Sequence, residues 1–214
     1  MRNSLADVVA AALRVLDAQG LENCSMRRVA AELDVQPSAL YHHVPNKQSL
    51  LALMADEIVR GVGVAQARAG AETPEAAAAA ARRLCVDLRT AMLAVRDGAD
   101  VVATAAAFRL GRSRVEERLA RLVGGDGART LLLFTFGHAQ STQTHRQAAA
   151  LGALVADPEP GGGPAAAAGA AGEDGGAEDG GAAGDAAEAP LGADLDASFG
   201  RGLDLILAGL AQLA

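Results

Sequence analysis

The segment spanning residues 25–47 limits the possible fold more than any other part of the chain. Ser25 is a good helix cap, because its hydroxyl accepts a hydrogen bond from an N–H group left unpaired at a helix start. Val29, Ala30 and Leu33 follow at helical spacing and place apolar side chains on one face. A short amphipathic helix is therefore predicted directly after Ser25.

A second short helix follows a tight turn at residues 34–36. Pro37 suits the first position of this helix, where its missing N–H is not needed. Leu40 and Val44 are expected to face the core, and Pro45 is expected to end the helix. The side chains left on the outer faces are polar, small or aromatic: Ser38, Ala39, Tyr41, His42 and His43. Two short helices of this kind are typical of a helix-turn-helix, whose second helix enters the major groove of DNA.

The same segment resembles the DNA-binding domain of the TetR/AcrR family of transcriptional regulators. The family pattern is Leu-Tyr-x-His-Val/Phe, then x-Asn-Lys and a Leu-Leu pair. This chain has Leu40-Tyr41-His42-His43-Val44, Asn46-Lys47 and Leu50-Leu51, and the likeness covers roughly residues 4–60 without a gap. The resemblance implies a bacterial repressor that binds its operator as a dimer and is released by a small molecule.

The resemblance also implies roles for individual side chains. Arg27 would reach a phosphate or a guanine edge, although a solvated surface arginine is the alternative. Side chains at the start of the second helix would meet base edges, and Lys47 would anchor a phosphate. The DNA-binding candidates are Arg27, Arg28, Gln36, Pro37, Ser38, Ala39, Tyr41, His42, His43 and Lys47. A metal shared by His42 and His43 is not expected, because adjacent helical residues point about 100° apart.

The net charge of −7 runs against DNA binding until its distribution is considered. Nine acidic residues and no Lys or Arg fall within residues 157–194, and the remainder has 19 basic against 17 acidic residues. Residues 1–60 still hold six Lys and Arg against seven Asp and Glu. Phosphate binding is therefore expected to depend on local clustering of Arg27, Arg28 and Lys47.

Helical periodicity continues through the chain, and no strand pattern is found. Residues 1–60 are predicted as a three-helix DNA-binding domain, with a first helix over 4–19 that buries Leu5 and Leu16, and a further helix over 47–62 that leads away. Residues 61–214 are predicted as a helical effector-binding and dimerisation domain. Its helices are expected at residues 74–95, 99–108, 112–123, 128–156 and 195–213, with Gly124-Gly125 as a break.

Residues 157–194 are rich in Gly, Ala and acidic side chains, with 11 glycines between Gly161 and Gly192. Such a composition cannot bury enough apolar surface to offset the entropy of ordering, so a flexible loop is predicted. The long apolar helices on either side favour pairing with a second copy. The fold class is therefore all-α, with an N-terminal helix-turn-helix and a C-terminal domain that binds a ligand and dimerises.

Two further stretches, Arg96-Asp97-Gly98-Ala99 and Phe134-Thr135-Phe136-Gly137, resemble the ligand-binding core of the tetracycline repressors. The implied effector site lies between the helices of residues 84–92, 101–108 and 131–145. Its candidates are Leu84, Leu88, Met92, Val102, Phe108, Phe134, His138, Gln140, Thr142 and His145. The polar members can alternatively form a stripe at the dimer interface or be satisfied within their helix.

This sequence departs from those repressors where they hold magnesium. Val102 stands at the position of their metal-binding His, and Ala105-Ala106 replaces the Arg-Pro that follows. No acidic residue occurs between residues 130 and 156. A mostly apolar small molecule is therefore expected rather than a magnesium–tetracycline complex, with no metal and no cofactor.

Several protein classes are disfavoured. The chain has no nucleophile elbow, phosphate loop or zinc spacing, so an enzyme is not expected. It has no long apolar span or signal peptide, and Cys24 and Cys85 are far apart, so a cytoplasmic protein with reduced thiols is predicted. The hypothesis is a homodimeric, ligand-responsive repressor that binds an inverted-repeat operator. The alternatives are a helical interaction module without specific DNA binding, and an activator of the same fold.

Overall fold

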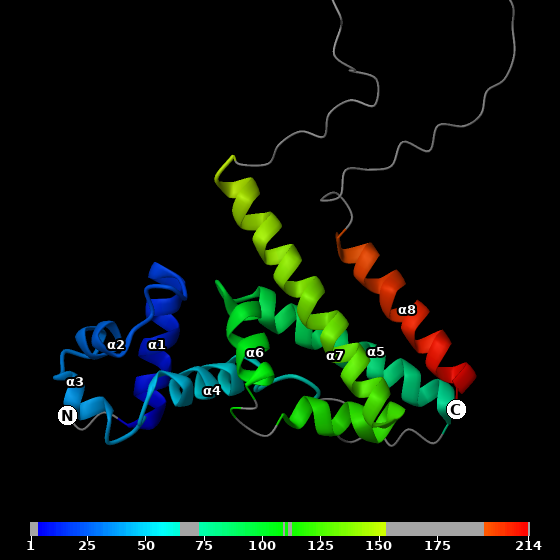
Figure 1. Ribbon diagram of the computed structural model, residues 1–214, viewed down its shortest axis with the longest axis horizontal. Helices are drawn as coiled ribbons and strands as arrows, with labels where there is room; N and C mark the ends of the chain where they lie inside the picture. The colour runs from blue at the N-terminus through cyan, green and yellow to red at the C-terminus, as the bar shows by residue number, and fades with distance from the viewer. Residues whose placement is uncertain (1–3, 65–72, 109, 111–112, 153–194, 214) are drawn as a thin grey trace, which may run out of the picture.

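A computed structural model describes residues 4–64, 73–108, 110, 113–152 and 195–213 (Figure 1). All regular secondary structure in these ranges is helical, which confirms the predicted fold class. The helices are α1 (Leu5–Gln19), α2 (Met26–Glu32), α3 (Pro37–Leu40), α4 (Lys47–Ile58), α5 (Pro74–Leu93), α6 (Gly98–Ala107), α7 (Arg114–Ala150) and α8 (Leu195–Leu213). The loop predicted at residues 157–194 lies outside the described residues. None of the described helices is long and apolar enough to cross a membrane.

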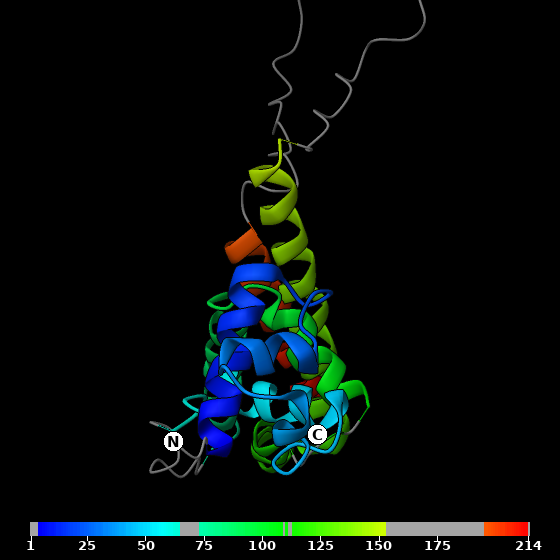
Figure 2. The ribbon, with the colours of Figure 1, turned by 90° about the vertical axis from the view of Figure 1, so that its left-hand side faces the viewer.

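Helices α1–α3 form one end of the molecule, here called the head, and α4 runs from it toward α6 (Figures 1 and 2). The predicted caps are present. The Ser4 hydroxyl accepts from the Asp7 N–H at 3.2 Å, and the Asn46 Oδ1 accepts from the Ser49 N–H at 2.8 Å. Leu16, Leu40 and other apolar side chains from α1 to α4 are buried in the shared core. The predicted caps of α1 and α4 are thus present, and apolar side chains from these helices share one core.

Two helix boundaries and one predicted burial in this region need correction. Helix α3 has only four residues, and Tyr41 to His43 form a turn instead of continuing the helix. Pro45 disfavours helical backbone at the residue before it, Val44, so the helix cannot extend through this segment. Helix α4 ends at Ile58 rather than near residue 62. Leu5 is 40% exposed instead of buried, because it lies at the start of α1 on the rim of a cleft.

Helices α5–α8 form the other end of the molecule, here called the body, and α4 connects it to the head. Helix α5 packs along α7, and α8 lies beside both. The backbone of α7 is not helical at Gly124, where φ is 77° and ψ is 169°. Residues before the kink cross the lower part of the molecule in Figure 1, and residues after it rise beside α8. The predicted break at Gly124 is thus confirmed, although the helix ends at Ala150 and not near residue 156.

Candidate nucleic-acid interface and ligand cleft

The surface around α3 carries the sequence-predicted DNA-binding residues. Leu40 and Val44 are buried to within 1% and fix this segment on the head. Tyr41 is 53% exposed, and Pro37 is half-buried. The other candidates on this segment are all exposed: Gln36, Ser38, Ala39, His42 and His43. Gln36 precedes the helix without a side-chain capping bond, so its amide is open to an external partner.

Three cationic side chains border this surface. Arg27 and Lys47 are exposed at the starts of α2 and α4. Arg28 is also exposed, and its guanidinium donates to the Gln19 side-chain oxygen on α1. The structure therefore places all ten candidates on one continuous stretch of the head, from α2 to the first residue of α4. Such a set of donors and small side chains can meet phosphates and base edges.

Two acidic residues of the head, Glu32 and Asp7, have partners within it. The Arg14 Nε lies 2.8 Å from the Glu32 Oε1, which ties α1 to α2. Asp7 is engaged in the cap of α1, and its hydrogen bonds with Ser4 lower the pKa of its carboxyl.

A cleft of about 1390 Å³ separates the head from the body. It is lined from α1, α4, α5, α6 and α7 and includes Leu88 and Val102, two of the predicted effector-binding residues. The other eight candidates do not line it. Sequence reasoning thus missed the contribution of α1 and α4, because nothing in their local pattern distinguishes a side chain in the core from one beside a cleft.

The remaining effector candidates are dispersed. Leu84 and Met92 are buried in the core of the body, and Phe108 is 71% exposed at the end of α6. The Gln140 amide donates to the Asp100 Oδ1 at 2.8 Å, which ties α7 to α6. His145 is half-buried on α7. The expectation that all ten residues line one cavity is therefore not what the structure shows.

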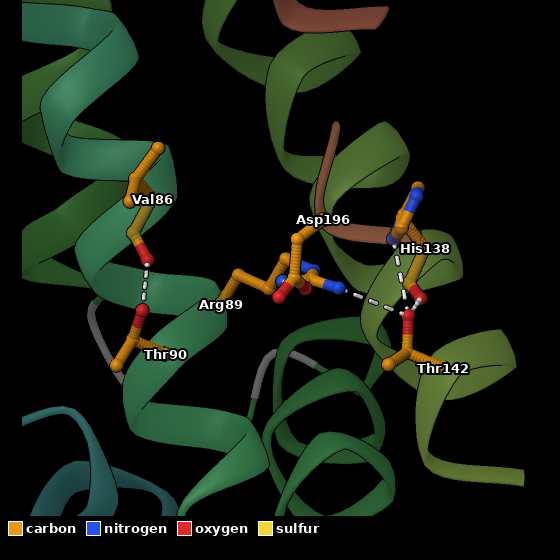
Figure 3. A network of polar contacts seen from close by, with 6 residues as sticks. All are labelled: Val86, Arg89, Thr90, His138, Thr142 and Asp196. Atoms are coloured by element: carbon orange, nitrogen blue, oxygen red, sulfur yellow. Dashed lines mark hydrogen bonds and ion pairs between the residues drawn. The ribbon is translucent and has the colours of Figure 1, made fainter. Parts of the chain in front are cut away.

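Phe134, His138 and Thr142 lie instead where α7 meets α8. The Phe134 and Phe199 rings are stacked with centroids 5.5 Å apart, and the His138 ring is 5.0 Å from that of Phe199. The Thr142 hydroxyl donates to the His138 carbonyl oxygen at 2.8 Å (Figure 3). These side chains help to join α8 to α7 rather than to line the cleft. This contact between the two helices is called the α7–α8 seam below.

Arg89 is the central residue of this seam, and the sequence analysis did not identify it. Its guanidinium is buried, donates to Asp196 at 2.7 Å and to the Thr142 hydroxyl at 3.2 Å (Figure 3). It also lies 4.9 Å from the centroid of the Phe199 ring. The sequence does indicate that Arg89 is buried. It lies four residues after Cys85 and three before Met92, so helical spacing places it on the buried face of α5.

The seam also changes two acid–base equilibria. Burial lowers the pKa of His138, and the positive charge of Arg89 lowers it further. The hydrogen bond and the charge of Arg89 hold the pKa of the Asp196 carboxyl below its ordinary value. Both shifts favour neutral His138 and ionised Asp196, and the ionised carboxylate is the form that pairs with Arg89.

A second polar connection joins the head to the body at the turn before α6. The Arg96 guanidinium donates to the Asp17 and Ala18 carbonyl oxygens at 3.1 and 3.3 Å. The Asp97 carboxylate accepts from the Leu21 N–H at 2.8 Å and from the Gln147 amide at 2.6 Å. Arg96 and Asp97 are called the clasp below, because they attach the end of α1 to the body.

Comparison with known proteins identifies the class. Residues 8–54 match the family model of bacterial regulatory proteins of the tetR family. The transcriptional repressor DrrR1 of Streptomyces coeruleorubidus is 55% identical over 53 residues, which are 25% of this chain and 20% of DrrR1. The class G tetracycline repressor protein of Vibrio anguillarum is 33% identical over 94 residues, 44% of this chain and 43% of that protein. The chain thus aligns with less than half the length of these curated relatives.

Solved structures extend the likeness to the whole chain. BioQ of Mycobacterium smegmatis is 30% identical, with a TM-score of 0.71 and 99% of each chain covered. A structure of BioQ with its double-stranded DNA operator is 32% identical, with a TM-score of 0.60, and covers 68% of this chain and 89% of that one. The chain belongs to the TetR family of regulators, whose N-terminal domain carries a helix-turn-helix. Its relatives are transcriptional regulators, which is a non-enzymatic role.

Proposed function

We propose that this chain is a homodimeric repressor that occupies an inverted-repeat operator until a small molecule releases it. The observation that carries the proposal is the exposed row of side chains around α3, held in place by the buried Leu40 and Val44. Tyr41 is 53% exposed, whereas the large apolar side chains of α1 to α4 are mostly buried. Its hydroxyl can donate to a phosphate oxygen.

The relatives support the DNA partner. One is a transcriptional repressor by name, and another was solved with its double-stranded DNA operator. The ten candidate residues all lie within residues 8–54, which match the family model. We assign Gln36, Ser38 and Ala39 to base edges, and Arg27, Tyr41 and Lys47 to phosphates.

Pairing of two copies is supported by the outer faces of α7 and α8. Leu133 of α7 is 65% exposed and Leu205 of α8 is 75% exposed. A Cβ added to Gly137 or Gly209 would meet nothing within 4 Å, so these faces are open and free of bulky side chains. Exposed apolar side chains beside small residues let two helix pairs approach closely. A two-fold dimer would present two heads to successive major-groove faces, which requires an inverted repeat.

Footprinting tests the proposal on the DNA upstream of the chain's own gene and its neighbours, across a salt series. We expect protection of an inverted repeat that weakens steeply as salt increases, because binding releases counterions from phosphates. Tyr41→Ala should abolish the protection, whereas Glu75→Ala, an exposed change at the start of α5, should leave it intact. Equal binding to unrelated DNA at moderate salt would instead favour the interaction-module alternative.

The effector's action is proposed as a population shift. An effector weakens operator binding only to the extent that it binds the released geometry more tightly than the DNA-bound one. Helix α4 makes contact with both α1 and α6, so it connects the head to the ligand-facing part of the body. We expect the effector to be a mostly apolar molecule that enters between these elements.

A further inference from the structure

The cleft between head and body has walls from both. On the body side, Leu88, Val102 and Leu132 line it and are otherwise buried, so the cleft reaches into the interior of the body. On the head side, Leu5, Val9 and Leu13 of α1 line it at a spacing of four residues. That spacing places them on one face of the helix. A ligand in this space would therefore contact the head directly, without an intervening helix.

The walls favour an uncharged ligand. The charged lining has both signs, with Asp56, Glu57 and Glu117 against Arg14, Arg60, Arg114 and Arg118. Arg14 pairs with Glu32 at 2.8 Å, and Arg60 pairs with Glu57. Arg118 donates to the Val62 carbonyl oxygen at 3.2 Å. The volume of about 1390 Å³ exceeds the roughly 300–1,000 Å³ of ordinary ligand pockets, so the cleft has room for an extended molecule.

The clasp fixes the opposite end of the same helix. Arg96 and Asp97 hold the carbonyl groups of the last turn of α1 and the Leu21 N–H just beyond it. The Gln147 amide anchors Asp97 to α7 at 2.6 Å. Helix α1 is thus attached to the body at its C-terminal end, while its N-terminal part borders the cleft. This arrangement gives the head a pivot at one end and an open space at the other.

We propose that an uncharged, largely apolar ligand acts as a wedge in this cleft, pushing on α1 itself and rotating the head about the clasp. This inference rests on the proposed repressor function and specifies where its effector acts. The ligand binds best when the cleft is widened, and widening turns α3 away from its position in the operator-bound dimer. The differential affinity for the two head positions sets the size of the effect.

A tethered ligand tests the wedge without knowing the natural effector. The chain has two cysteines, and both are buried, with Cys24 at 1% and Cys85 at 0% exposure. Ala10→Cys on α1 and Ala106→Cys on α6 each add an exposed thiol at the cleft lining. Each full-length variant is labelled with N-ethylmaleimide or with the bulky, apolar N-(1-pyrenyl)maleimide. Ala79→Cys, exposed on α5 outside the cleft lining, is the matched control.

Operator affinity of each labelled protein is measured with the DNA fragment found by footprinting. We expect the pyrenyl group at either cleft position to weaken binding by about tenfold or more, the ethyl group to weaken it much less, and the control to be unchanged. Pyrene emission at the two cleft positions should also report an apolar environment. Unchanged affinity with all pyrenyl adducts, or an equal loss at Ala79, would overturn the wedge. Failure of every unlabelled variant and the parent chain to bind an operator would instead overturn the repressor function.

Discussion

At the scale of single residues, close contacts decide which substitutions the body accepts. A Cβ added to Gly202 would lie 2.3 Å from the Phe134 Cζ, and that ring cannot move without disturbing its stack on Phe199. Gly202 therefore lets the backbone of α8 approach α7. The Arg89–Asp196 and Arg82–Asp204 pairs, each at 2.7 Å, fix the same helix against α5.

Gly202→Ala should lower the free energy of unfolding by about 1–3 kcal/mol, because the added methyl group overpacks the α7–α8 contact. Urea denaturation followed by circular dichroism measures the change. Gly61→Ala is the control, since a Cβ there meets nothing within 4 Å. Its expected effect is within about 0.5 kcal/mol of zero. Equal stability of the two variants would show that the ring yields freely.

His138 should make stability depend on pH. Its folded-state pKa lies below the ordinary value of 6.5, so the unfolded chain binds the proton more readily. Stability is therefore complete above the unfolded pKa and falls as the pH drops from about 6.5 through the lowered folded pKa. We expect the urea concentration at the unfolding midpoint to be lower at pH 5 than at pH 7.5. The decrease should be smaller in His138→Asn. An equal fall in both proteins would assign the pH dependence to other groups.

At the scale of elements, the turn before α6 has more contacts than its sequence indicates. Asp97 has φ of 54°, a left-handed conformation that Asp tolerates better than most residues. The backbone strain is compensated by the hydrogen bonds of its carboxylate to both the head and α7. Gln143 reinforces the turn by accepting from the Ala99 N–H at 3.2 Å. The turn therefore attaches the C-terminal end of α1 to α6 and α7.

Arg96→Ala should loosen the end of α1 without unfolding the body. The variant removes the donors to the Asp17 and Ala18 carbonyl oxygens. Hydrogen–deuterium exchange of the last turn of α1 should become roughly tenfold faster, which corresponds to a modest loss of local stability. Arg83→Ala, an exposed change on α5, provides the control. Unchanged exchange in α1 would contradict the attachment of the head through Arg96.

At the scale of the whole molecule, the proposed function requires a dimer, and the neighbouring helices α7 and α8 are the proposed interface (Figure 1). Leu205→Arg would bury a charge in the proposed interface. We expect sedimentation equilibrium to show dissociation at least tenfold easier than for the parent chain, with a parallel loss of operator affinity. Ala79→Arg adds the same charge on α5 and should leave the dimer intact. A Leu205→Arg protein that remains fully dimeric would place the interface elsewhere.

The sequence by itself determined the elements of this protein. Ser4, Ser25 and Asn46 cap helices because capping depends on neighbouring residues alone, and Pro37 and Gly124 mark a start and a break for the same reason. The exposure of most DNA-binding candidates also followed from helical periodicity, while their contact with DNA stays a prediction. Local rules of this kind need no knowledge of the rest of the chain.

Only the tertiary structure decided which distant residues meet. Arg96 reaches α1 across 79 residues and Asp97 reaches Leu21 across 76, and no local pattern encodes either contact. Some of the predicted effector residues line the cleft, and others lie at the α7–α8 seam. The reason is that α8 packs against α5 and α7 and covers one side of α7. Local propensity sets where helices begin and end, whereas a cavity is the space left after long-range packing has placed them.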